Sequence, residues 1–206
     1  MTMDRWEIDS GHSGIHFSIR HMALARVRGQ FTRWSGTLAA EDGDLRGACV
    51  SILIDASSVH TGLEERDAHL RSADFLDVEA FPEILFQGRV CAPPRGHRFR
   101  IRGELAVLGR VHPMIFEVCN TGRVIDPWGH ERAGFSCAGT LDRSAFGITW
   151  NRPLGALGHL VANEVEFEMD VEAVLQEPGA PRGDRPPASG RLPHRPGLID
   201  RGALSF

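Results

Sequence analysis

The chain has 206 residues, enough for one domain with a sizeable core and a tail. All 23 basic residues are arginine and there is no tyrosine, which excludes a lysine Schiff base, a phosphate-loop lysine and a tyrosine acid. The formal net charge of -4 argues against broad adhesion to nucleic acids or anionic membranes, because such adhesion normally needs a basic excess.

The opening residues, MTMDRWEIDS, lack the basic flank and apolar run of a secretory signal. No stretch of the chain approaches the roughly 20 apolar residues of a membrane span. We therefore expect a cytoplasmic protein without membrane insertion. The four cysteines stand singly in strand-like runs without paired metal spacing, and they are expected to be buried, reduced thiols. They are Cys49, Cys91, Cys119 and Cys137.

Residues 12–36 predict the first hairpin. Ile15, Phe17 and Ile19 alternate with more polar residues, which is the two-residue period of a strand with one apolar face. A short break after His21 leads into a second predicted strand, in which Phe31 is expected to share a face with Arg33 and Ser35.

Strand patterns recur along most of the chain. They lie at residues 6–9, 13–20, 27–39, 45–55, 84–91, 98–108, 114–125, 134–142 and 161–175. In the last of these, Phe167 and Met169 face one way while glutamates face the other. Short, turn-rich links between the strands favour an antiparallel meander, and closing the sheet into a barrel would remove its exposed edges.

One segment, Gly62–Ser72, has helical spacing, with Thr61 as the predicted N-terminal cap. We expect this helix beside or over a barrel mouth. Residues 176–206 are rich in proline, glycine and arginine and cannot bury enough apolar surface to fold alone. The predicted organisation is a barrel domain over residues 1–175 and a flexible tail over 176–206.

The ten histidines suggest no metal site. His12 and His16 on one strand would lie about 13 Å apart, at roughly 3.3 Å per residue, which is too far to share an ion. Glu65 and His69 share a helical face without a second histidine. Because the chain also lacks a nucleophile elbow, a phosphate-binding glycine loop and a dinucleotide fingerprint, we predict no metal, no cofactor and no catalytic residues.

Four motifs occur in an order that resembles the YceI family. They are HSxxxFxxxHM with VxGxF in residues 12–31, TGLEERDAHLRSADFLDVEAFPEILF at 61–86, GELAVLGRVHPMIFEV at 103–118 and LDRSAFGITWN at 141–151. The resemblance covers roughly residues 4–175. It implies an all-β fold, an eight-stranded antiparallel lipocalin-like barrel with one short helical segment. It also implies a long-chain hydrophobic partner, since family members are thought to carry polyisoprenoids or other long amphiphiles, and related barrels can form homodimers.

The leading hypothesis is therefore a noncatalytic protein that binds, sequesters or transports an isoprenoid, quinone precursor or fatty acid derivative inside the barrel. The alternative is a cofactor-independent cyclase or isomerase, with His21, Asp67 or His69 transferring protons in the lumen. A third hypothesis is a scaffold that uses the tail to bind a partner. The predicted ligand contacts are Phe17, Ile19, His21, Phe31, Asp67, His69, Phe75, Phe135, Arg143, Phe146, Ile148 and Trp150.

These side chains also have structural interpretations. His21, Asp67 and His69 could form hydrogen bonds that fix the helix to the barrel rim, and each apolar residue taken singly could simply pack in the core. Arg143 could hold a turn by pairing with Asp142 or with the RDAHLRS segment.

Overall fold

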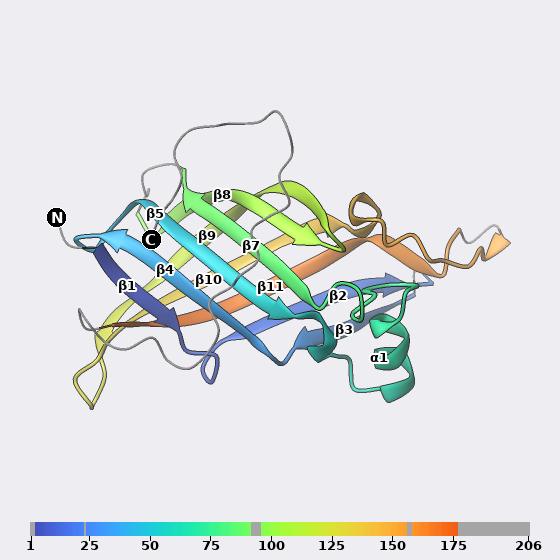
Figure 1. Cartoon of the computed structure of the whole chain (residues 1–206), viewed down its shortest axis with the longest axis horizontal. Helices are drawn as coiled ribbons and strands as arrows, with labels where there is room; N and C mark the ends of the chain where they lie inside the picture. Colours follow the sequence, from blue (N-terminus) through green and yellow to red (C-terminus); the bar gives the residue numbers. More distant parts are fainter. Residues whose placement is uncertain (1–2, 23, 92–95, 156–157, 177–206) are drawn as a thin grey trace.

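A computed structural model describes residues 3–22, 24–91, 96–155 and 158–176 as a closed antiparallel barrel (Figure 1). Eight strands form its ring, in the order β1, β4, β5, β7, β8, β9, β10 and β11, and pairing of β11 with β1 closes it. This arrangement confirms the predicted fold class. The ring strands are β1 (Met3–Ile8), β4 (Trp34–Glu41), β5 (Asp44–Asp55), β7 (Glu83–Val90), β8 (Arg98–Val107), β9 (Arg110–Ile125), β10 (Glu131–Asp142) and β11 (Val161–Leu175).

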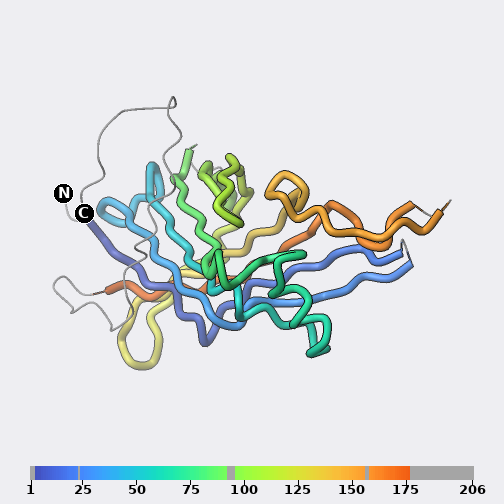
Figure 2. Tube along the Cα trace, turned by 45° about the vertical axis from the view of Figure 1, so that its right-hand side comes forward, coloured from blue at the N-terminus to red at the C-terminus, as the bar shows by residue number. Residues whose placement is uncertain are grey.

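Three further strands extend the sheet at one end of the barrel. They are β2 (Gly14–His21), β3 (Ala25–Phe31) and the short β6 (Val59–His60). β11 is long enough to pair with β1 near its own end and with β2 along residues 161–170. The β2–β3 hairpin, blue in Figure 2, therefore continues the wall beside β11, which is orange there.

The prediction of a single strand over residues 27–39 is wrong. The chain bends at Thr32 and Arg33, and the bend divides this stretch into β3 and β4. Phe31 lines the barrel interior, whereas after the bend Trp34 is buried in its place. The two residues of the bend shift the alternation by one position, so the inward face changes from odd to even residues. Arg33 is consequently exposed. On the surface its Nε donates a hydrogen bond to the carboxylate of Asp55 at 2.9 Å.

The inward faces of the ring strands form the hydrophobic core. The predicted alternation in β8 is confirmed, since Phe99, Ile101 and Leu105 are all buried while the arginines between them are exposed. Gly103 interrupts this row of side chains for a steric reason. A Cβ atom there would lie 2.2 Å from the carbonyl oxygen of Gln87, so the close approach of β7 and β8 requires glycine.

The predicted helix is present as α1 (Glu64–Arg71), but its predicted cap is wrong. The N-cap residue is Leu63, which makes no side-chain capping bond, and Thr61 instead binds Asp67. The segments η1 (Ala56–Ser58) and η2 (Arg143–Phe146) are single-turn 3-10 helices. α1 lies at the end of the barrel where β2 ends and β3 begins, as Figure 1 shows, and we call this the α1 end.

All four cysteines are free thiols. The prediction that they are buried is wrong: Cys91 is exposed, and Cys49, Cys119 and Cys137 are only half-buried. Among the described residues, no helix is both long and apolar enough to cross a membrane. Apart from Gln176, the predicted tail lies outside the described residues.

Candidate functional site in the barrel lumen

The barrel encloses a cavity of about 600 Å³, which we call the lumen. Its wall takes inward-facing side chains from every strand of the ring and from α1. The volume lies in the range of about 300 to 1,000 Å³ that is typical of small-molecule sites. Most of the wall is aliphatic or aromatic, as expected for a site that holds an apolar molecule.

All predicted ligand contacts except Asp67 belong to this wall. The structure thus brings together residues from β2, β3, α1, β10 and the 143–150 segment, which are far apart in the sequence. Sequence reasoning missed much of the wall contributed by other strands, although strict alternation in those strands was the available signal. The missed residues include Val50, Ile52, Phe86, Ile101, Phe116 and Phe167.

Charged side chains and histidines of the wall lie mostly at the α1 end, and His16 near the start of β2 also belongs to the wall. Glu65, Arg66 and His69 come from α1, and His21 is the last residue of β2. Arg143 begins η2 directly after β10, close to the start of β11, which pairs with His21. The lumen is therefore apolar along its length and charged at one mouth.

His69 is fixed in an aromatic cluster at this mouth. Its ring centroid lies 4.9 Å from that of Phe75 and 4.7 Å from that of Trp150, both in edge-on geometry. Its Nε2 lies 3.0 Å from a carboxylate oxygen of Asp74. These contacts attach α1 to the segment after η2 and make His69 part of the rim.

Asp67 points away from the lumen and is fully buried, with an exposed fraction of 0%. It accepts hydrogen bonds from the backbone N–H of Thr61, at 2.9 Å, and from the Thr61 hydroxyl, and it lies 3.1 Å from Nδ1 of His60. Burial alone would raise the pKa of Asp67, but the hydrogen bonds from Thr61 and the neighbouring His60 lower it below its ordinary value. Asp67 thus joins α1 to β6, as its structural interpretation predicts.

Arg143 holds a turn, but not through the predicted ion pair. Its Nε donates to the carbonyl oxygen of Ala162 at 2.9 Å, and its Nη1 donates to those of Ile148 and Trp150, both at 3.0 Å. Asp142 instead accepts from the backbone N–H and hydroxyl of Ser144. Within the described part of the chain, Arg143 forms no salt bridge with a carboxylate.

Cys137 supplies a thiol to the lumen wall from the middle of β10. Burial raises the pKa of this thiol to about 11. At neutral pH the side chain is therefore protonated and behaves as a small apolar group.

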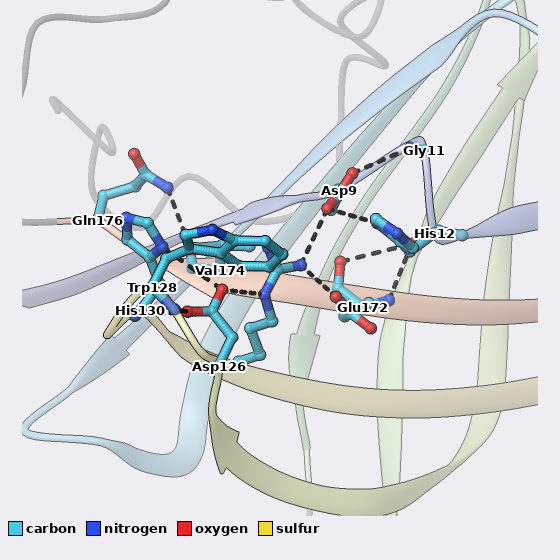
Figure 3. A network of polar contacts seen from close by, with 11 residues as sticks. Asp9, Gly11, His12, Asp126, Trp128, His130, Glu172, Val174 and Gln176 are labelled. Atoms are coloured by element: carbon cyan, nitrogen blue, oxygen red, sulfur yellow. Dashed lines mark hydrogen bonds and ion pairs between the residues drawn. The ribbon is translucent and has the colours of Figure 1, made fainter.

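A second polar cluster lies outside the lumen wall (Figure 3). Asp9, His12 and Glu172 come close enough together to suggest a metal site, but the guanidinium of Arg132 already lies among them. Its Nη1 donates to Asp9 at 3.0 Å and to Glu172, and its Nε donates to Asp126 at 2.7 Å. This cluster is better explained as a link between the β1–β2 connection, β10 and β11.

The ionisation of the cluster agrees with this structural role. Burial would raise the pKa of Asp126, but hydrogen bonds from Arg132 and from backbone N–H groups lower it well below its ordinary value. Asp126, Asp9 and Glu172 together raise the pKa of Arg132. Asp9, Asp126 and Arg132 therefore carry their charges at neutral pH.

The structure thus belongs to the class of small, closed antiparallel barrels, with an apolar lumen and charged groups at one mouth. The model of the YceI-like domain matches residues 6–173, and the chain belongs to the YceI family. Protein YceI of Salmonella newport is 34% identical over 166 residues, which cover 81% of this chain and 83% of that protein. A UPF0312 protein of Vibrio cholerae is 28% identical over 163 residues, covering 79% and 82%.

Solved structures share the fold at lower sequence identity. BcnA of Burkholderia cenocepacia has a TM-score of 0.69 at 18% identity, over 80% of this chain and 98% of BcnA. The YceI protein of Campylobacter jejuni has a TM-score of 0.67 at 22% identity, over 77% and 91%. A polyisoprenoid-binding domain from Saccharophagus degradans has a TM-score of 0.59 at 12% identity, over 83% and 98%.

Proposed function

We propose that the protein binds the apolar chain of a long amphiphile in its lumen, and so sequesters or carries an isoprenoid, a quinone precursor or a fatty acid derivative. The observation that carries this proposal is the cavity of about 600 Å³ with its predominantly aliphatic and aromatic wall. Membership of the YceI family and the fold shared with a polyisoprenoid-binding domain support it.

The binding energy of such a ligand depends more on the length of its apolar tail than on the chemical identity of the tail. Burying one methylene contributes about 0.8 kcal/mol, so affinity grows with the length of chain that enters the lumen. Apolar contacts are not directional, and the wall therefore accepts prenyl and straight-chain tails of similar width. Discrimination between ligands falls to the charged mouth.

The enzymatic alternative needs a group that transfers protons to a substrate in the lumen. Asp67 is directed away from the lumen, with both of its carboxylate oxygens engaged by Thr61 and His60. Of the other two groups named for this role, His69 is bound to Asp74, and His21 stays in the wall at the mouth of the lumen. Deeper in the wall, the thiol of Cys137 stays protonated at neutral pH. Binding is accordingly the function that the geometry supports better.

Mass spectrometry of organic extracts tests the proposal. Protein purified natively from its own host should release a long-chain amphiphile in near-equimolar amount, because the apolar wall holds it through purification. The same preparation, unfolded, stripped of lipid and refolded, should release none and should then take up added farnesol or hexadecanol. An extract without amphiphile, from a folded protein that also takes up neither alcohol, would contradict the proposal.

A further inference from the structure

Arg143 is a buried cation surrounded by neutral acceptors. Its exposed fraction is 3%, yet its hydrogen-bond partners are the carbonyl oxygens of Ala162, Ile148 and Trp150. Burial lowers the pKa of Arg143 and the charge of Asp142 opposes this shift. Because the ordinary pKa of arginine is so high, the guanidinium stays charged. The fold therefore keeps a positive charge beside the lumen that has no ion-pair partner in the described part of the chain.

The remaining nitrogen of this guanidinium has no acceptor among the described residues. Nη2 of Arg143 is buried and makes no hydrogen bond with them, although Nε and Nη1 of the same side chain make three. Buried donors are nearly always paired, and an exception needs an explanation such as a missing ligand. Arg143 is part of the lumen wall, and because Nη2 itself is buried, a ligand head group supplies that acceptor after the side chains around it move aside.

The other arginine of the wall, Arg66, already donates hydrogen bonds to a neighbouring residue. Nε of Arg66 donates to the Thr61 hydroxyl at 2.6 Å, and its Nη2 donates to the Thr61 carbonyl oxygen at 2.9 Å. It thus supports the Asp67 cluster. Arg143 differs from Arg66 in being deeply buried, so that its unpaired Nη2 is closed to water as well.

The position of Arg143 also fits the mouth of the lumen. The carbonyl group that accepts from its Nη1 belongs to Trp150, whose ring packs against His69 and Phe75 at the rim. A polar head at this end leaves the tail to run along the apolar wall toward Leu38 and Phe99. The head and tail of one amphiphile therefore match the two parts of the lumen.

We propose that Nη2 of Arg143 donates a hydrogen bond to an anionic oxygen in the ligand head group, a carboxylate or a phosphate. The lumen then selects amphiphiles with oxyanion heads over neutral ones with the same tail, because only an anion also compensates the buried charge. This inference rests on the proposed function, since it assumes that the tail lies in the lumen.

Titration calorimetry on the full native chain tests whether anionic amphiphiles bind more tightly than neutral ones, by comparing two pairs of ligands with the same tail. Palmitic acid is compared with hexadecanol, and farnesyl phosphate with farnesol, below their aggregation limits at pH 8. We expect at least one anion to bind about tenfold more tightly than its alcohol, which corresponds to about 1.4 kcal/mol. Discrimination within the first pair alone identifies a carboxylate head, and within the second alone a phosphate head.

The outcomes separate this inference from the proposed function. If both alcohols bind as tightly as both anions, the inference is overturned while lumen binding stands. If none of the four compounds binds, the proposed function itself fails.

Two variants then attribute the selection to Arg143. Arg143→Gln should lose the preference for the anion, whereas Arg152→Gln should keep it, because Arg152 is exposed and lies over the Trp150 ring at 5.9 Å. Equal preference in folded Arg143→Gln and native protein overturns the inference. Where Arg143→Gln does not fold, NMR of the Arg143 guanidinium in the native chain decides. Its resonances should shift with the preferred anion and not with the matching alcohol, and an equal response to both overturns the inference.

Discussion

Replacing Cys137 by phenylalanine is expected to weaken the binding of a long-chain ligand about 50-fold. Cys137 lies in the wall of the lumen, so a benzyl side chain at this position projects into the space proposed for the tail. Displacing about three methylenes of the tail costs about 2.4 kcal/mol, which corresponds to that loss of affinity. Titration with hexadecanol, which lacks an anionic head, measures the effect of the tail alone.

The matched control is Cys119→Phe on the neighbouring strand. Val118 lines the lumen, and because successive side chains of a strand alternate, Cys119 faces away from it. The control should bind hexadecanol like the native protein. Equal affinities for the two variants, both folded by circular dichroism, would mean that the tail binds elsewhere.

Asp67→Ala is expected to lower the free energy of unfolding by about 3 kcal/mol, because it leaves buried donors of Thr61 without an acceptor. The same change also detaches α1 from β6, since Asp67 lies beside His60 of that strand. Urea denaturation followed by tryptophan fluorescence measures the loss. Asp74→Ala provides the control, because its contact with His69 is largely exposed and such pairs contribute about 0 to 1 kcal/mol.

The contribution of Asp67 also has a defined pH dependence. Its pKa is lower in the folded protein than in the unfolded chain, where it is about 3.9. The ionised carboxylate therefore stabilises the fold above that pH, and the stabilisation is lost as the pH falls further through the folded pKa. The difference in stability between native protein and Asp67→Ala should shrink below about pH 4. A difference that is constant between pH 7 and pH 3 would contradict this account of the carboxylate.

The barrel and much of its lumen were predictable because alternation is a local signal. β8 and β11 show it residue by residue, and the side chains that it placed inward do lie inside. The bend at Thr32 and Arg33 was not predictable in this way, because both residues fit a continuous strand. The bend moves the inward face from odd to even residues, and this change depends on how the strands of the ring pair on either side of the bend.

The polar contacts were harder to predict because they join residues distant in sequence or use backbone acceptors. Arg132 lies 123 positions from Asp9 and 40 from Glu172, and no local pattern links them. Arg143 was expected to find a carboxylate, yet its partners are carbonyl groups, which every residue possesses. Asp67 was recognised as a candidate, but the direction of its side chain depends on how α1 packs against β6.

Intermolecular nuclear Overhauser effects between a bound hexadecanol and protein methyl groups test most directly that the lumen holds the tail. The account predicts contacts to the methyl groups of Ile52, Ile101 and Val118, which line the lumen. Val124 and Ile125 are internal controls, because they are exposed on β9 and should show none. Contacts to Val124 and Ile125 with none to the lumen residues would place the ligand on the outer surface and contradict the account.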